Sequence, residues 1–414
     1  MAGLLSTGQD TGVAAPSISV EEHLARVTAL LAPAEVVSLP LADCLGLALA
    51  EDLHAPMALP PFDNSAMDGY AVRACDILGA GRDAPLSLPV TQDIPAGHTD
   101  PRPLRAGTAH RIMTGAPMPV GADAVVAVEE TDAGTETVQV FAEVAARTHV
   151  RYVGEDVATG GLCLPAGTEI GPAAIGLAAA VGSADLPVRR RLRVLILSTG
   201  TELVEPGTAL RHGQIYESNG KMLAAAVRAA GGTPTLLRSV ADDVEQFHAT
   251  LRPELAGTDL IVTSGGVSAG AYEVVKDAFT EQGVDFYRVA MQPGGPQGCG
   301  RFSGVPVITL PGNPVSTGIS FEIFVRPAMR SAMGFARPRR QAIRARLSEE
   351  VTSLPGRSQF RRGLFDYAAG TVALHGGPGS HLLTALATSN VLVVLEPDDV
   401  HLPAGAEVEV LPLP

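Results

Sequence analysis

The sequence predicts a multidomain protein of the α/β and β class, in which a doubly wound parallel sheet is flanked by smaller β-rich domains. The chain has 414 residues, more than a single hydrophobic core ordinarily supports. In its middle part, short apolar runs alternate with amphipathic stretches, as the strands and helices of βαβ units do. Both flanks instead contain short alternating runs separated by glycine and proline, which are typical of small β domains.

The N-terminal part predicts helices followed by a β domain. Apolar residues recur at helical spacing from Ser17 to Leu31, after a serine that can cap the helix. A second short helix is expected near residues 41–50. Runs such as DAVVAVEET and TVQVFAEV predict a small β domain between residues 57 and 150. The run PAAIGLAAAVG then predicts one small helix within residues 151–190.

Residues 191–333 predict the doubly wound sheet. The runs RVLILS, DLIVTS, DFYRVAM and PVITLP predict its strands, and KMLAAAVRAAG, VEQFHATLRPEL and YEVVKDAFTEQG predict its helices. After the RPRR segment at 337–340, short β-like runs ending in NVLVVLE and EVEVLPLP predict a small C-terminal barrel.

The composition is that of a folded enzyme without a polyanionic partner. Hydrophobic residues make up 46% of the chain and charged residues 18%, which excludes a disordered protein. The formal net charge is -14, so nucleic acid and anionic membranes exert no general attraction. Eight arginines lie between residues 337 and 362, but the total charge and the lack of interleaved aromatics favour a solvated linker and barrel face.

The cysteines and the N-terminus favour a cytoplasmic location. The four cysteines form no CxxC pair, so neither a zinc site nor a disulfide framework is expected. The N-terminal stretch lacks the basic and apolar regions of a signal peptide, and no run reaches the roughly 20 apolar residues of a membrane span. We therefore expect a soluble protein of the reducing cytoplasm.

Three predicted strands run into loops that suit an anionic ligand. The loops are STGTEL (198–203), SGGVSAG (264–270) and PGNPVS (311–316). Glycine lets backbone amides approach an anion closely, and the helix N-termini that follow add a favourable dipole. Because ligands of doubly wound sheets gather at the carboxyl ends of the strands, the loops predict one site. The candidate substrate-binding residues are Ser198, Thr199, Gly200, Ser264, Gly265, Gly266, Ser268, Pro311, Gly312, Asn313, Pro314 and Ser316.

Carboxylates among these loops point to a cation. Glu202, Asp242 and Glu273 supply hard oxygen ligands, which favour Mg²⁺. Asp242 could instead be a helix N-cap and Glu273 a partner of the helix dipole. Lys276, one of only two lysines, lies on the same helix face as Glu273 and could form a surface ion pair or contact a phosphate or oxyanion.

Several motifs together resemble the MoeA family and the related E domain of gephyrin. They are PPFDNSAMDGYAVR (60–73), RIMTGAPMPVGADAVVAVEET (111–131), STGTEL, GQIYESNGKML (213–223), TSGGVSAG with Lys276, and LPGNPVS. The resemblance covers residues 17–414. It implies four domains: a discontinuous N-terminal domain (17–55 and 152–190), a β domain (56–151), a molybdopterin-binding α/β domain (191–333) and a C-terminal β barrel (337–414).

The resemblance also implies the assembly and the catalytic residues. Family members are elongated homodimers whose cleft lies between the α/β domain of one subunit and the β domain of the other. Asp68 of the DNSAMDG signature and Thr114 of IMTGAP would therefore reach the site from the partner chain. The full implied catalytic set is Asp68, Thr114, Asp156, Glu202, Asp242 and Glu273, with the last three as the metal ligands.

Two departures from the family pattern concern charge. Glu273 stands where better-known members have Asp, so the carboxylate is kept with one more methylene. Gln292 and Gly295 stand where many relatives carry the lysines of a KPGKP segment. Arg288 and Lys276 are the nearest replacements by sequence, and Asp63 completes the implied substrate contacts. The segment GRSQFRRG (356–363) could also touch the pterin.

The implied activity is molybdenum insertion during molybdenum cofactor synthesis. Adenylylated molybdopterin and molybdate would be the substrates, Mg²⁺ would assist, and AMP would be released. Positioning and charge neutralisation should dominate, because two anions must meet two soft sulfurs. The upstream molybdopterin adenylyltransferase is a candidate partner.

Alternative functions remain open. A molybdopterin adenylyltransferase would resemble residues 191–333 alone and would not need the other domains. A gephyrin-like scaffold or carrier would be expected to have a long linker or second enzymatic domain, and neither is present. Tungstate in place of molybdate is equally compatible, since the two anions have nearly the same size and charge.

Overall fold

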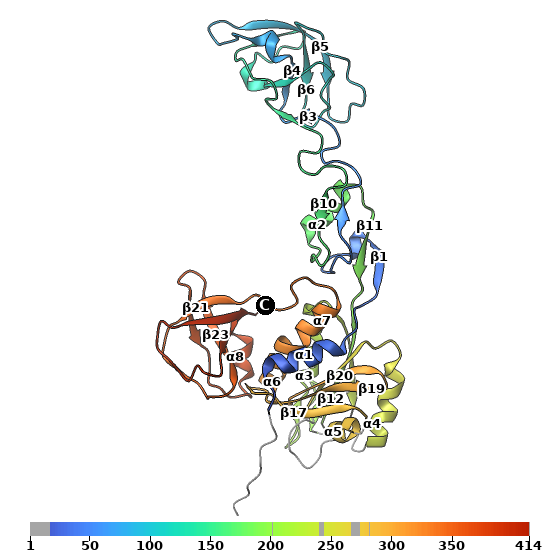
Figure 1. Ribbon diagram of the computed structural model, residues 1–414, viewed down its shortest axis with the longest axis vertical. Coiled ribbons are helices and arrows are strands. Elements are labelled where there is room, and N and C mark those ends of the chain that lie inside the picture. The colour runs from blue at the N-terminus through green and yellow to red at the C-terminus, as the bar shows by residue number, and fades with distance from the viewer. Residues whose placement is uncertain (1–16, 201, 240–243, 266–273, 281, 414) are drawn as a thin grey trace, which may run out of the picture.

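The chain forms an elongated molecule with four bodies (Figure 1). The computed structural model describes residues 17–200, 202–239, 244–265, 274–280 and 282–413. A small β body stands at one end and a smaller mixed body in the middle. The α/β body and a C-terminal barrel lie side by side at the other end. In the described part of the chain, no helix is both long enough and apolar enough to cross a membrane.

The β body is built on a five-stranded sheet of order β7-β4-β6-β5-β8. Its core includes Tyr70 and Val126, both fully buried. Gly69 is the glycine of DNSAMDG, and a side chain there would overlap the Val126 carbonyl, so packing requires glycine. The strands of this body are β3 (Asn64–Ser65), β4 (Gly69–Val72), β5 (Leu86–Ile94), β6 (Ala109–Ile112), β7 (Ala124–Ala127), β8 (Thr137–Val140) and β9 (Val150–Arg151).

The middle body contains segments from both sides of the β body in sequence. β1 (Val36–Pro40) pairs antiparallel with β11 (Asp185–Arg189), and β2 (Leu53–His54) pairs with β10 (Leu162–Leu164). α2 (Pro172–Ala180) covers them, where one small helix was predicted. The short helix expected near residues 41–50 is wrong, because that segment forms only a 3-10 turn over Leu41–Asp43 before Gly46 turns the chain with φ +73°.

The α/β body contains a six-stranded sheet of order β15-β12-β16-β20-β19-β17. The first four strands are parallel, whereas the last two form an antiparallel edge. The run DFYRVAM therefore lies in this edge and not among the parallel strands. The strands are β12 (Arg193–Thr199), β15 (Thr233–Ser239), β16 (Leu260–Ser264), β17 (Val284–Arg288), β19 (Pro296–Phe302) and β20 (Val305–Leu310).

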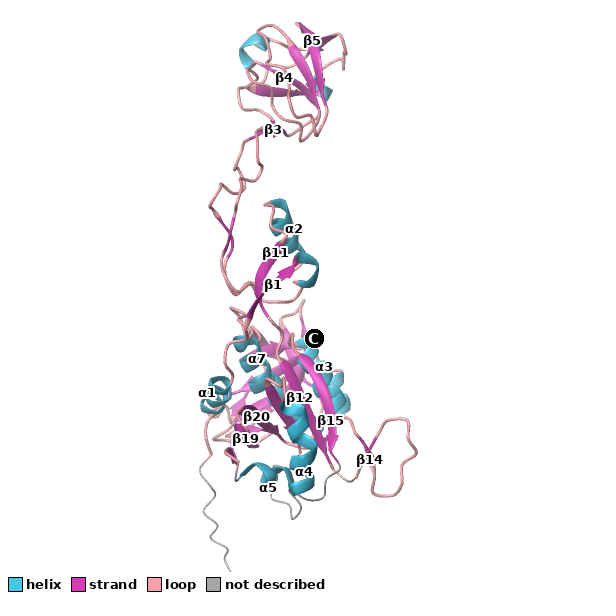
Figure 2. Ribbon diagram, turned by 90° about the vertical axis from the view of Figure 1, so that its right-hand side faces the viewer, coloured by secondary structure: helices cyan, strands magenta, loops and turns pink. Residues whose placement is uncertain are grey.

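Helices cover both faces of this sheet (Figure 2). α4 (Val244–Leu251) and α5 (Val274–Thr280) pack on one face around Phe247 and Phe279. On the other face lie α3 (Asn219–Ala229) and a continuous helical segment made of α6 (Pro314–Ser320), a π turn (Phe321–Val325) and α7 (Arg326–Ala332). Alternate side chains along the strands pack into the two hydrophobic cores, one on each face of the sheet, as a doubly wound sheet requires.

The first helix packs on the α/β body. α1 (Val20–Leu30) begins after Ser19, whose hydroxyl accepts a hydrogen bond from the Glu22 amide at 3.0 Å. Its buried side chains Val20 and Leu24 join a core with Phe324. The sequence expectation grouped this helix with the discontinuous N-terminal domain, whereas its contacts are with the helices of the α/β body.

The C-terminal region forms the predicted barrel. Its order β23-β24-β21-β27-β25 closes through pairing of β23 with β25. β18 (Met291–Gln292) of the α/β body adds to β23, and α8 (Leu383–Ala387) lies beside α6 (Figure 1). The remaining strands are β21 (Ile343–Leu347), β22 (Val351–Thr352), β23 (Ser358–Asp366), β24 (Thr371–Leu374), β25 (Val391–Leu395), β26 (His401–Leu402) and β27 (Glu407–Pro412).

Candidate active site

The three loops predicted to bind an anion meet at one edge of the α/β sheet. β12, β16 and β20 are parallel neighbours, so their carboxyl ends lie together. The Gly265 amide donates to the Leu310 carbonyl at 3.0 Å. A Cβ on Gly312 would lie 3.3 Å from the Gly265 Cα, so two backbones approach closely where glycine permits it.

The first loop presents an exposed carboxylate. Gly200 has φ +151°, and a Cβ there would lie 2.7 Å from either carboxylate oxygen of Glu202. Glu202 is exposed, and its side chain forms no hydrogen bond or ion pair with another described residue. The chain then leaves the body as a projecting excursion whose base is the short parallel pair β13 (Leu203–Val204) and β14 (Ile215–Tyr216) (Figure 2).

The third loop is held by its own helix. Asn313 precedes α6, and Pro314 occupies its first turn, where the missing N–H costs nothing. The Thr317 hydroxyl donates to the Pro311 carbonyl at 2.5 Å and lies 3.0 Å from the Asn313 carbonyl. Ser316 is buried.

The C-terminal barrel covers this third loop. The Val315 amide donates to the Ser380 carbonyl at 3.2 Å. Arg362 of β23 is buried and donates to the carbonyls of Gly377 and Gly379. Burial lowers the pKa of Arg362, and the positive charge of Arg361 lowers it further. The basic residues of this region were expected on a solvated linker and barrel face, whereas Arg362 is buried and fixes the barrel loop that lies against α6.

The remaining predicted residues of the α/β body are only partly described. Gly266, Ser268, Asp242 and Glu273 lie outside the described residues. Lys276 is half-exposed on α5, and its carbonyl accepts from the Thr280 hydroxyl at 2.7 Å. Arg288 is exposed at the end of β17, and a Cβ on Gly295 would lie 3.7 Å from its Nη2. No cluster of three or more potential metal ligands occurs within the described ranges.

The β body brings Asp68 and Thr114 together. One Asp68 carboxylate oxygen accepts from both the amide and the hydroxyl of Thr114, each at 2.7 Å. These two hydrogen bonds, the backbone one foremost, lower the pKa of Asp68, so this exposed carboxyl stays ionised. Asp63 accepts from the Val153 amide at 2.8 Å, and Asp156 is exposed in the connection to the middle body.

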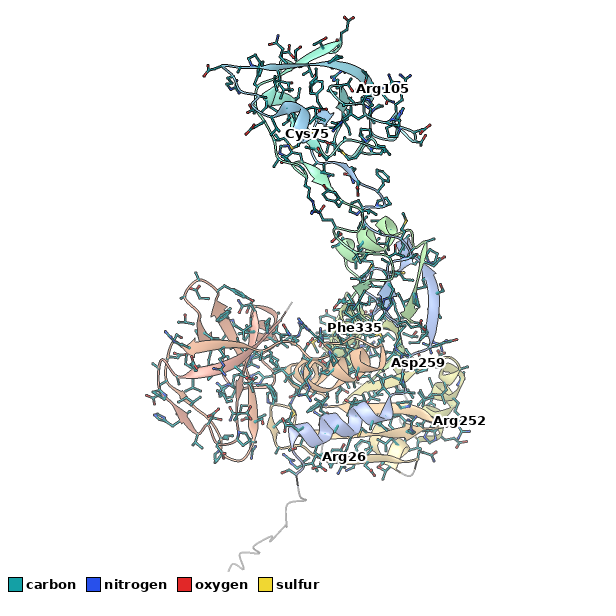
Figure 3. The ribbon with its side chains drawn as sticks, turned by 45° about the horizontal axis from the view of Figure 1, so that its top comes forward. Arg26, Cys75, Arg105, Arg252, Asp259 and Phe335 are labelled. Carbon is teal, nitrogen blue, oxygen red and sulfur yellow. The ribbon has the colours of Figure 1, made fainter. Side chains whose placement is uncertain are left out.

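Within one chain, these β-body residues are far from the three loops. The β body and the α/β body lie at opposite ends of the molecule (Figure 1). The middle body lies between them and separates their side chains (Figure 3). A single chain therefore does not assemble the whole set of predicted residues.

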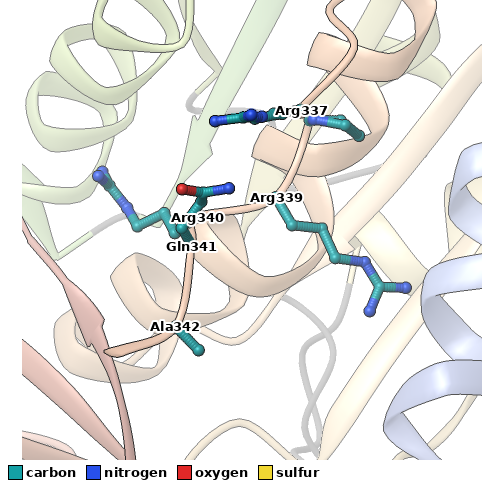
Figure 4. Close-up of a pocket in the computed structure, with 6 residues that line it drawn as sticks. Arg337, Arg339, Arg340, Gln341 and Ala342 are labelled. Carbon is teal, nitrogen blue, oxygen red and sulfur yellow. The ribbon is translucent and has the colours of Figure 1, made fainter. Parts of the chain in front are cut away.

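The basic segment after α7 forms a groove of about 630 Å³ (Figure 4). Arg340 donates from Nε to Glu322 at 2.6 Å, and Arg326 donates to the Pro338 carbonyl at 3.2 Å. Burial, aided by the charge of Arg340, lowers the pKa of Arg326 to about 10. The segment is thus a linker fixed to the helix before it. Its lining residues are Arg337, Pro338, Arg339, Arg340, Gln341 and Ala342.

Sequence reasoning missed a buried carboxylate beside the first loop. Glu217 is 2% exposed and accepts from the Ser198 hydroxyl at 2.9 Å. The available signal was the position of Glu217 directly before the SNG sequence that begins the helix. An acidic residue at that position is equally typical of a helix cap on the surface.

Three family regions match the chain in order. The MoeA N-terminal region (domain I and II) matches residues 18–182, the probable molybdopterin binding domain matches 195–331, and the MoeA C-terminal region (domain IV) matches 344–413. The molybdopterin-binding match contains all three loops at the sheet edge.

Curated relatives match nearly the whole chain. Molybdopterin molybdenumtransferase 2 of Mycobacterium tuberculosis (strain ATCC 25618 / H37Rv) is 51% identical over 399 residues, covering 95% of this chain and 98% of the relative. Molybdopterin molybdenumtransferase of Bacillus subtilis (strain 168) is 33% identical over 402 residues, covering 95% of this chain and 94% of the relative.

A solved structure has the same architecture. The molybdopterin biosynthesis moeA protein from Pyrococcus horikoshii OT3 superposes with a TM-score of 0.83 at 28% identity, covering 96% of this chain and 100% of that one. The resemblance inferred from the motifs is confirmed. The chain belongs to the MoeA family of molybdenum cofactor biosynthesis.

Proposed function

We propose that this chain is a molybdopterin molybdenumtransferase that inserts molybdenum from molybdate into adenylylated molybdopterin and releases AMP. The observation that carries the proposal is the meeting of three glycine-containing loops at the carboxyl edge of the sheet, inside the region that matches a molybdopterin binding domain. The two relatives named as molybdopterin molybdenumtransferases support the same reaction.

The loops would act by holding anions in place. Backbone amides near Gly200, Gly265 and Gly312 can approach phosphate or molybdate oxygens without hindrance from a Cβ. Arg288 and Lys276 are the candidate cations in place of the family lysines missing at Gln292 and Gly295. Such a site works by positioning its substrates and neutralising their charge.

Mg²⁺ is the proposed cofactor. The exposed Glu202 carboxylate has no partner among the described residues, and its hard oxygens fit this cation, with Asp242 and Glu273 as the other proposed ligands. The ion would offset the charge of two anionic substrates.

A homodimer is proposed to complete the site. The Asp68 carboxylate and its hydrogen-bond partner Thr114 lie at the opposite end of the molecule from the loops, so a second subunit would have to present them. The reducing cytoplasm is the proposed location, which agrees with four free cysteines. The upstream adenylyltransferase remains a proposed partner.

Release of AMP tests the activity. Purified protein is given adenylylated molybdopterin with and without molybdate and Mg²⁺, and Asp68→Asn serves as the comparison. Molybdate-dependent release that the substitution abolishes is expected. Tight binding without release would instead identify a scaffold or carrier, and formation of the adenylylated pterin from ATP would identify an adenylyltransferase. Tungstate in parallel reactions reports the anion preference.

Subunit mixing tests the shared site. Asp68→Asn and Glu202→Gln are each expected to be inactive alone. If each site combines two subunits, mixed dimers contain one intact site, and a random mixture should regain about a quarter of wild-type activity. Failure to regain activity despite proven subunit exchange would show that each chain supplies both residues.

A further inference from the structure

A single buried carboxylate joins the first loop to the start of α3. Glu217 Oε1 accepts from the Ser198 hydroxyl at 2.9 Å and from the Gly220 amide at 2.6 Å. The Glu217 amide also donates to the Val204 carbonyl at 2.8 Å. Glu217 thus connects the carboxyl end of β12, the base of the projecting excursion and the first turn of α3.

The carboxylate serves as the cap of α3. Ser218 occupies the N-cap position but its side chain forms no capping hydrogen bond, so the Glu217 carboxylate receives the first-turn amide instead. A Cβ on Gly220 would lie 3.0 Å from Glu217 Oε1 and 2.7 Å from Leu236 Cδ1. Glycine at 220 is therefore required for the carboxylate to sit where it does.

Asn219, the first residue of α3, connects this helix to the third loop. Asn219 Nδ2 donates to the Gly312 carbonyl at 2.6 Å. Together, Ser198, Glu217, Gly220, Asn219 and Gly312 form a connection that we call the loop brace. It joins two of the three loops at the sheet edge, although they lie more than a hundred residues apart in sequence.

The loop brace contains two buried oxygens whose hydrogen-bonding capacity is unused within the described residues. Glu217 Oε2 and Asn219 Oδ1 are both buried and have no hydrogen-bond partner in the part of the chain that the structure describes. Burying such oxygens is costly, and an apolar pair of similar shape would avoid that cost. The arrangement is therefore explained poorly by stability alone.

We propose that Glu217 and Asn219 are positioning residues that set the distance between the STGTEL and PGNPVS loops. This inference rests on the proposed molybdenum transfer, in which two anions must be held in a fixed relation. Neither residue needs to touch the substrate. Loosening the brace shifts the two loops slightly relative to each other. Such a shift reduces turnover more than it reduces substrate binding.

The test separates turnover from binding in the full-length protein. Glu217→Ala and Asn219→Ala are each expected to lower kcat about 100-fold while KM for adenylylated molybdopterin changes less than about threefold. Glu217→Gln should stay within about threefold of wild type, because its amide oxygen still accepts from Ser198 and Gly220. Since both residues act in one connection, the double alanine variant should be no slower than the slower single variant.

A control on the same helix excludes general loosening. Ala224→Gly lies in the buried face of α3 away from the loops and should lower the melting temperature while kcat stays unchanged. Wild-type kcat in both alanine variants would overturn the proposal. So would effects that multiply in the double variant, or a Glu217→Gln variant as slow as Glu217→Ala.

Failure of the proposed function is distinguishable from failure of the brace. If wild type itself releases no AMP in the presence of molybdate, the transferase proposal fails. The brace is then judged by amide hydrogen exchange at residues 311–316. Asn219→Ala should accelerate that exchange relative to Ala224→Gly, and equal rates in the two variants would overturn it.

Discussion

At the scale of single residues, motif chemistry located the candidate loops but not the contacts that hold them. The glycines of STGTEL, SGGVSAG and PGNPVS could be assigned to one sheet edge because parallel strands end together. Glu217 could not, since its role depends on burial between β12 and α3, which no local pattern reveals. The role of Arg362 could not be predicted from the sequence either, because its acceptors are the carbonyls of Gly377 and Gly379 in another loop of the barrel.

His23 gives a pH prediction at the same scale. It is fully buried, its Nδ1 lies 2.9 Å from the Tyr287 hydroxyl, and burial, aided by Arg26, lowers its pKa from 6.5 to about 4. Between these two pH values only the unfolded chain takes up a proton at His23. The contribution of His23 to the free energy of unfolding is therefore fully present above pH 6.5 and declines as the pH falls to 4. The loss amounts to about 3 kcal/mol.

Denaturant unfolding at pH 7 and pH 4.5 measures this loss. The His23→Gln variant cannot titrate at this position and should lose about 2 kcal/mol less than wild type between the two pH values. An identical pH dependence in wild type and variant would show that His23 does not contribute.

At the scale of elements, strong hydrophobic runs were predicted well and glycine-rich strands were not. RVLILS, DLIVTS and PVITLP became three adjacent parallel strands. β19 has the sequence PQGCGRF, whose glycines weaken any strand signal. It is a strand because β20 and β17 pair with it on both sides, so tertiary pairing and not local preference decides its structure.

The tight turn between β19 and β20 gives a prediction for this element. Phe302 pairs with Val305, and the two turn residues have positive φ, +48° at Ser303 and +84° at Gly304, as a type I′ hairpin requires. Gly304→Ala should destabilise the protein by about 1 kcal/mol, because alanine is strained at this φ. Gly304→Asn should cost less, since asparagine tolerates the left-handed region. Thermal unfolding compares the two, and equal losses would contradict a conformational cause.

At the scale of the whole molecule, the sequence predicted the bodies better than their connections. The barrel and the doubly wound sheet followed from residue patterns. The packing of α1 on the helices of the α/β body did not, because its amphipathic pattern specifies a buried face without naming what covers it.

An ion pair between Arg190 and Asp259 joins the middle body to the α/β body. Arg190, which follows β11, donates to both carboxylate oxygens of Asp259 at 2.7 and 2.9 Å. Burial alone would raise the pKa of Asp259, but the hydrogen bonds from Arg190 and Arg193 outweigh it and lower the pKa from 3.8 to about 2. The resulting stability is present above pH 3.8 and is lost as the pH falls through 2.

Asp259→Asn should therefore destabilise the folded chain at neutral pH by about 1–2 kcal/mol, after allowance for solvent screening. The difference between variant and wild type should shrink as the pH falls below 3.8, because the unfolded wild type then takes up a proton that the folded chain binds only near pH 2. Denaturant unfolding at pH 7 and pH 2.5 measures it. A difference that stays constant over this range would show that the charge of Asp259 is not its cause.

Two segments of the chain connect the β body to the middle body. The chain passes through residues 55–63 on its way out and 151–161 on its way back, and Leu59 and Val157 exchange backbone hydrogen bonds at 2.8 and 3.1 Å. These two hydrogen bonds hold the outgoing and returning segments together at this point. Lengthening only one of the two segments would break the pairing of Leu59 with Val157, so the reach of the β body is set by both segments together.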